Sequence, residues 1–152
     1  MKEDITVALD VYKALKQLKK GLTENWSNIS FDFEIKGEDD SEEAWATASV
    51  TLKGFDDDIR LIFTAHAGGG VEFRAVFDEL DLNYEVLELL NAFNEREFYF
   101  KLYVRSNGYL EVNHDFICDD PTVLVDYVGE CLSRLADLSD DEIMQALTAH
   151  TH

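Results

Sequence analysis

The sequence has few residues that could cross-link or stiffen the chain. It contains 1 proline and 2 cysteines in 152 residues, so a disulfide framework cannot hold the fold together. No segment approaches the ~20 consecutive apolar residues that a bilayer-spanning helix needs. The fold must therefore rest on a hydrophobic core, and the 46% of hydrophobic residues supply the material for one. We expect a single domain over residues 1–152.

Basic residues are also scarce. The chain has 13 Lys and Arg against 32 Asp and Glu, which gives a formal net charge of -19 at pH 7. Such a charge repels nucleic-acid phosphates and anionic lipids, because affinity for either depends on clustered Lys and Arg. We therefore expect neither a nucleic acid nor a membrane as partner. The charge favours a basic protein partner, although acidity that only maintains solubility would give the same composition.

Signals for secretion, metal binding and covalent catalysis are weak. The first residues, MKEDIT, place acidic side chains where a signal peptide needs a basic region, which favours the cytoplasm. None of the 4 histidines lies in a recognised metal motif, and no serine lies in a nucleophile elbow. His114 and Cys118 form a speculative catalytic or metal pair that lacks a third partner. We expect no enzyme activity, metal or cofactor, and a solvated tail at His150–His152.

Apolar residues follow the helical period in four segments and alternate in six others. Helices are predicted over residues 4–22, from Asp81 or Asn83 to about Asn94, from Asp119 or Asp120 to about Asp137, and from Ser139 onward. Strands are predicted near residues 29–36, 44–52, 59–65, 71–78, 98–104 and 110–116. The order helix, four strands, helix, two strands, two helices indicates an α+β fold. We expect an antiparallel sheet, or two packed parts, with helices on one side.

Two glycine positions have different predicted roles. Gly21 follows a run of lysines, so it is well placed to end the first helix. The segment 67–70, Ala-Gly-Gly-Gly, resembles a phosphate-binding loop in composition only. Phosphate loops lie between a strand and a helix and a P-loop adds a lysine, whereas this segment joins two predicted strands. We therefore predict a hairpin connection there.

Small and amide side chains indicate how the elements pack. The inward residues of the second predicted strand are small, which suggests that a helix packs closely over it; they are Ala44, Ala46 and Ala48. Asn91 and Asn94 lie three residues apart near the end of the second predicted helix. We predict that they tie this helix to the hairpin that follows, by satisfying backbone groups.

The hairpin around Ser106-Asn107-Gly108 has a predictable register. A two-residue turn would leave both faces mixed in polarity, whereas a three-residue loop with left-handed Gly108 pairs Val104 with Leu110 and Leu102 with Val112. We favour the three-residue loop, because a shift of one residue moves every side chain to the other face. It also directs Phe98 inward.

The same register leaves Tyr99, Lys101, Tyr103 and Arg105 on the outer face as one candidate surface. Aromatic and cationic residues in alternation can stack on single-stranded nucleic acid, but the acidic charge argues against that ligand. Tyr and Arg are also enriched in protein interfaces. We predict a protein-binding surface at these four residues, with ordinary packing under a helix or across strands as the alternative.

The segment LLNAFNEREFYFKLYVRSNGYLEVNHDF resembles the bacterial YbjN-like proteins, a group similar in fold to type III secretion chaperones. The likeness covers about Asn83 to Leu135: a helix ending in an LNxFN-like segment, a lysine-bearing strand, a turn, a second strand and a terminal helix. The chain departs from that group by a fourth strand before the middle helix and by a short final helix. The resemblance implies a noncatalytic protein-binding or regulatory module, often dimeric.

These observations lead to three functional hypotheses. The first is an acidic adaptor or chaperone-like protein that holds a partner segment on its sheet or helical surface, with homodimer formation as a second form of association. The next is an acidic inhibitor or immunity-type protein that neutralises a basic partner. The third is an enzyme whose active site leaves no motif in the sequence.

Overall fold

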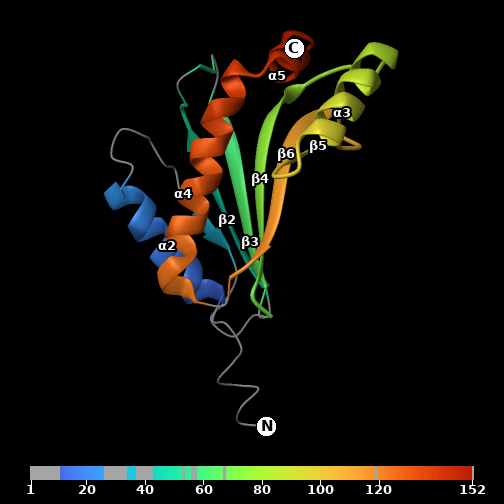
Figure 1. Cartoon of the computed structure of the whole chain (residues 1–152). Helices are drawn as coiled ribbons and strands as arrows, with labels where there is room; N and C mark the ends of the chain where they lie inside the picture. Colours follow the sequence, from blue (N-terminus) through green and yellow to red (C-terminus); the bar gives the residue numbers. More distant parts are fainter. Residues whose placement is uncertain are drawn as a thin grey trace.

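The computed structural model describes residues 11–25, 34–36, 43–52, 54–55, 58–66, 68–118 and 120–151 (Figure 1). The elements follow the predicted order and form an α+β fold. They are α2 (Val11–Asn25), β1 (Glu34–Lys36), β2 (Glu43–Val50), β3 (Ile59–His66), β4 (Gly70–Glu79), α3 (Tyr84–Arg96), β5 (Lys101–Val104), β6 (Tyr109–Ile117), α4 (Pro121–Asp137), the 3-10 turn η1 (Leu138–Asp140) and α5 (Glu142–Ala149).

All six strands belong to one sheet, in the order β1-β2-β3-β4-β6-β5, and every neighbouring pair is antiparallel. The structure thus selects one sheet over the two packed parts that the sequence left open. The chain leaves β4, passes through α3, forms the edge strand β5 and returns as β6 between β4 and β5.

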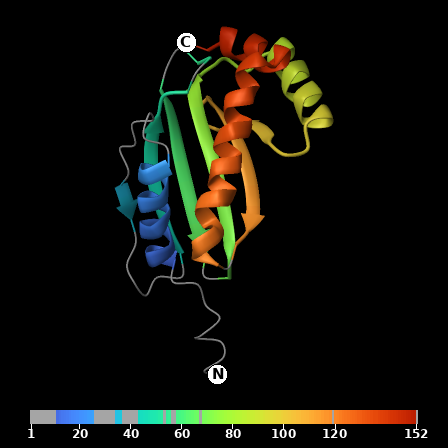
Figure 2. The same cartoon turned by 60° about the vertical axis from the view of Figure 1, so that its left-hand side comes forward.

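Helices α2 and α4 lie against one face of the sheet (Figure 2). Alternation in the strands directs apolar side chains to this face, and the small Ala44, Ala46 and Ala48 of β2 let α2 approach closely, as predicted. The buried apolar residues form one cluster, in which Phe63, Phe73, Phe93 and Phe100 are the largest side chains. Helix α3 packs against β5 and α5 instead.

The prediction that Gly21 ends the first helix is wrong, because α2 continues to Asn25. A Cβ atom at Gly21 would lie 2.7 Å from Cγ2 of Val125 in α4, closer than carbon atoms can approach. Gly21 therefore allows α2 and α4 to pack closely. The predicted start of this helix, at Asp4, lies outside the described residues.

Two of the three predicted helix caps are confirmed. The Asn83 side chain accepts a hydrogen bond from the Val86 amide at 2.9 Å, and Asp120 accepts one from the Thr122 amide at 3.0 Å. The predicted start of the last helix at Ser139 is wrong. Residues 138–140 form η1, so Asp141 caps α5 by accepting a hydrogen bond from the Met144 amide at 2.9 Å.

The predicted solvated tail is likewise corrected by the structure. Thr151 forms an antiparallel bridge with Leu80, just beyond β4. His150 lies near Glu85 of α3, with 3.6 Å between Nε2 and Oε2. Backbone pairing therefore holds residue 151 against the sheet, while His152 lies outside the described residues.

Both predicted hairpin connections are confirmed. Gly69 has a φ of 93°, and its amide donates to the carbonyl of His66 at 2.9 Å, so the chain turns here from β3 into β4. Gly108 has a φ of 89°, and β5 pairs with β6 in the predicted register, Val104 with Leu110 and Leu102 with Val112. The three-residue loop therefore sets which side chains face the core.

The inward placement of Phe98 is wrong, since this side chain is 89% exposed. β5 begins only at Lys101, and the chain bends at residues 98 and 99. The bend interrupts the two-residue alternation on which the prediction depended.

Candidate binding surface on the open face of the sheet

The four residues of the predicted surface lie in three different environments. Tyr103 and Arg105 lie together, with the guanidinium carbon 5.4 Å from the ring centroid. Lys101 donates through Nζ to the carbonyls of Asn94 at 3.2 Å and Glu97 at 3.1 Å, at the end of α3.

Tyr99 packs toward α4 instead of joining this surface. Its ring stacks on His114 with 3.9 Å between centroids, and the guanidinium of Arg134 lies 4.2 Å from its ring centroid. Its Oη atom is 3.4 Å from Sγ of the buried Cys131. The structure therefore brings together only Tyr103 and Arg105 of the four predicted residues.

No helix in the described part of the chain covers the sheet face opposite α2 and α4, which we call the open face. Directly paired residues of antiparallel strands point to the same side. The register consequently places five residues in one row across the open face: Ser49, Arg60, Val76, Glu111 and Tyr103. Trp45, Tyr103 and Ile117 are exposed on this face.

Glu111 is the buried charged residue at the centre of the open face, with 1% of its surface exposed. Its Oε1 atom accepts from Nε of Arg74 at 2.7 Å and lies 2.5 Å from Nη2 of the same residue, while its Oε2 accepts from Nε of Arg105. A buried carboxylate is costly unless both oxygens are hydrogen-bonded and its charge is paired, and these two arginines meet that requirement.

Arg105 is fixed by further contacts. With the Asn113 amide oriented so that its oxygen faces Arg105, that oxygen accepts from Nη2 of Arg105 at 3.0 Å and the amide nitrogen donates to the carbonyl of Val112 at 3.1 Å. The guanidinium also lies over the Tyr103 ring. These contacts hold Arg105 in one orientation before any ligand arrives.

A pocket of about 540 Å³ lies on the open face beside this cluster. Its lining includes the arginines 60, 74 and 105, three of the five in the chain, and the apolar side chains of Ile62 and Val76. The pairing of β4 with β6 is irregular between Val76 and Glu79. Such bulges redirect side chains at the ends of strands, and this one lies beside the pocket.

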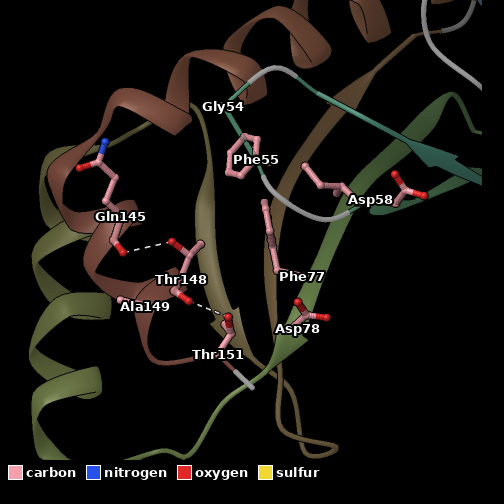
Figure 3. A pocket seen from close by; sticks show the side chains of 10 residues that line it. Gly54, Phe55, Asp58, Phe77, Asp78, Gln145, Thr148, Ala149 and Thr151 are labelled. Carbon is pink, nitrogen blue, oxygen red and sulfur yellow. Dashed lines mark hydrogen bonds between the residues drawn. The ribbon is translucent and has the colours of Figure 1, made fainter.

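A second pocket, of about 280 Å³, adjoins the first (Figure 3). Phe77 and the two carboxylates Asp58 and Asp78 line both pockets. In the second, Thr148 donates its hydroxyl to the Gln145 carbonyl at 3.0 Å and Thr151 donates to the Thr148 carbonyl at 2.6 Å (Figure 3). These hydroxyl groups satisfy carbonyls in the last turn of α5, so we assign Thr148 and Thr151 a structural role.

The buried thiol of Cys131 is poorly suited to act as a nucleophile. Burial raises the pKa of the Cys131 thiol to about 11, and burial also raises the pKa of its neighbour Tyr99. Both groups therefore stay protonated near neutral pH, whereas the thiolate is the reactive form.

The predicted pair His114 and Cys118 has separate hydrogen-bond partners. Nδ1 of His114 lies 2.7 Å from the Tyr99 carbonyl, and Sγ of Cys118 donates to the Asp120 carbonyl at 3.2 Å. Within the described ranges, no group of three or more His, Cys, Asp and Glu side chains is arranged to hold a metal ion.

The sequence did not predict the Arg74–Glu111 part of the site. The predicted hairpin register did pair Glu111 with Tyr103, which was a usable signal for the Arg105 contact. Arg74 lies on β4, and its approach to Glu111 depends on the pairing of β4 with β6, for which no local pattern exists. Predicting Arg74 as a site residue would therefore have required the order of the strands in the sheet.

Comparison with family models, curated proteins and solved structures finds no match to this chain. Among the described residues, no helix is both long and apolar enough to cross a membrane.

Proposed function

We propose that the protein is a noncatalytic, cytoplasmic protein-binding module, chaperone-like or adaptor-like, that holds a segment of a partner protein on the open face. The observation that carries the proposal is the open face itself, where Tyr103 is exposed beside Arg105 and Trp45 is exposed farther along the same face. Aromatic and arginine side chains are enriched in protein interfaces and among the residues that contribute most of the binding energy. The resemblance to YbjN-like proteins supports the same proposal.

A second candidate function is neutralisation of a basic partner by the outer surfaces of α3, α4 and α5. The observation that favours it is a set of exposed acidic residues on these helices and on η1: Glu85, Glu88, Glu95, Asp126, Glu130, Asp137, Asp140 and Glu142. This surface would bind through long-range attraction, which salt screens strongly.

Capture of partners by the immobilised protein, from an extract of the source organism, separates the two functions. We compare the wild type with Trp45→Ala and Tyr103→Ala, and use Tyr84→Ala as control because Tyr84 is an exposed aromatic residue on α3. Captures are made at about 0.1 M and about 1 M salt, where the screening lengths are ~10 Å and ~3 Å.

Binding on the open face predicts that the same partner is captured at both salt concentrations. Trp45→Ala or Tyr103→Ala should weaken its binding about 30-fold, as loss of an interface hot spot does, while Tyr84→Ala has no effect. Neutralisation predicts capture that high salt abolishes and that neither open-face variant changes. Salt-resistant capture that neither variant affects would contradict both. Sedimentation of the free protein identifies a second copy as the partner.

A further inference from the structure

The open face carries more guanidinium charge than its buried carboxylate neutralises. Glu111 supplies one negative charge to Arg74 and Arg105 together. Arg60 lines the same pocket from β3 and forms no ion pair with any residue in the described ranges. Val76 lies between Arg60 and Glu111 in the row across the sheet, so the three arginines flank an apolar floor.

The two paired arginines remain accessible. The side chain of Arg74 is 28% exposed and that of Arg105 is 46% exposed. A guanidinium has more N–H donors than one shared carboxylate accepts, so each keeps donors for a second acceptor. Glu111 and Asn113 fix the orientation of these groups, which reduces the entropy that a ligand must offset on binding.

Two further carboxylates, Asp58 and Asp78, line the pocket together with the arginines. Asp58 and Asp78 also line the adjoining pocket, so they mark the boundary between the two. Oδ1 of Asp58 accepts the Thr51 hydroxyl at 2.5 Å. Over the whole lining, the three arginines balance Asp58, Asp78 and Glu111, so anion binding depends on the positions of the guanidinium donors and not on a net positive charge.

We propose that this pocket binds an oxyanion, either a carboxylate or a phosphate, between the guanidiniums of Arg60, Arg74 and Arg105. Planar guanidinium groups bind both anions through paired hydrogen bonds, which a point charge such as ammonium cannot reproduce. Ile62 and Val76 would contact an apolar portion attached to the anion. The inference goes beyond the proposed function, because the anion can belong to a free small molecule or to a partner's acidic side chain.

The overall charge makes this site distinguishable from general ion binding. A chain with a net charge of -19 repels anions at long range, so weak nonspecific binding of anions over its surface is disfavoured. Any saturable binding of an anion must therefore come from a local cluster of donors.

The test is a titration of the full chain followed by the NMR signals of the arginine Nε–H groups, at constant ionic strength. The probes are inorganic phosphate, hexanoate, and an acetylated and amidated peptide that contains one glutamate. Sodium chloride is the reference. We expect saturable shifts at Arg60, Arg74 and Arg105 with at least one probe, and none at Arg134 on α4. A response to phosphate or hexanoate identifies a free small anion as sufficient, and a response to the peptide alone identifies a protein-borne carboxylate.

Variants of Arg60 separate guanidinium binding from charge alone. Arg60→Gln should weaken binding of the responding probe at least about tenfold, the usual effect of losing a charged hydrogen bond. Arg60→Lys should also weaken it, since lysine keeps the charge but not the planar fork. Arg134→Gln serves as the matched control and should leave the affinity unchanged.

Two results would overturn the inference: shifts that match the chloride reference for all three probes, or equal affinities for wild type and Arg60→Gln. Neither result bears on the proposed function, whose own test depends on Trp45 and Tyr103. If anions fail to bind while partner capture still requires Trp45 and Tyr103, the anion site is wrong and the protein-binding function stands.

Discussion

Asn94→Ala tests how helix α3 closes the edge of the sheet. In the structure, Nδ2 of Asn94 donates to the Leu102 carbonyl at 3.0 Å, and the Leu102 amide donates to Oδ1 of Asn94 at 2.8 Å. Leu102 lies on the edge strand, and these two backbone groups point away from β6. The amide side chain thus occupies the hydrogen-bonding position that a seventh strand would take.

The expected loss follows from those two hydrogen bonds. Each contributes ~1 kcal/mol net, so removing both should lower the free energy of unfolding by about 2 kcal/mol. With a urea dependence of about 2 kcal/mol per M, typical of a small domain, the unfolding midpoint should fall by about 1 M without a change in slope. Circular dichroism during urea titration measures both quantities.

Asn91→Ala is the matched control, because Asn91 is an exposed asparagine on the same helix. Its effect should stay within about 0.5 kcal/mol. Asn94→Asp should lose at least as much as the alanine variant, since a carboxylate cannot donate to the Leu102 carbonyl. Equal midpoints for Asn94→Ala and Asn91→Ala would refute the assignment of Asn94 as the group that closes the edge.

Two further predictions concern the contacts of α4. Gly21→Ala should destabilise the protein by about 1–2 kcal/mol despite the helix propensity of alanine, because the new Cβ would lie 2.7 Å from Val125. Adding Val125→Ala to the Gly21→Ala variant should recover part of that loss, as measured by urea unfolding. A Gly21→Ala variant more stable than the wild type would contradict the packing argument. Cys131 has a pKa raised by burial from 9.0 to about 11, so its protonated thiol favours the folded state. The contribution of this thiol to the free energy of unfolding is complete below pH ~9 and is lost as the pH rises toward ~11. Over that range the stability of Cys131→Ala should fall less than that of the wild type. Identical pH profiles for the two proteins would disprove the effect.

The sequence predicted the parts of the fold that depend on neighbouring residues. The register of the β5–β6 hairpin followed from polarity on each face and from Gly108, and the structure has that register. The contact of Asn94 with the hairpin followed from its place at the end of a helix, although Asn91, predicted for the same role, is exposed.

Predictions from the local sequence pattern were wrong where packing against an element distant in the chain decides the structure. Gly21 has the sequence context of a helix end, but its role is set by Val125, about a hundred positions away in the chain. Phe98 continues an alternating pattern, yet the chain bends before β5 begins. Tyr99 belongs to the same pattern, yet it stacks on His114 of β6 and contacts Arg134 of α4.

The candidate site was only partly predictable for the same reason. Tyr103 and Arg105 were found from the alternation of side chains along β5 and the residue that follows it. The buried Glu111 and its partner Arg74 were missed. A glutamate in a strand is predicted to face solvent unless the adjacent strand is known to supply an arginine. The order β4-β6-β5 supplies that neighbour.

The position of β6 between β4 and β5 has a consequence for the sequence of folding events. The strands β2, β3 and β4 pair with their chain neighbours, so their contacts close short loops. Pairing of β4 with β6 closes a loop that contains α3 and β5, and its entropy cost is larger. The β5–β6 hairpin closes through a three-residue loop and can form first. We therefore expect the hairpin to dock on β4 as a preformed unit, with the Arg74–Glu111 contact appearing at the rate-limiting step.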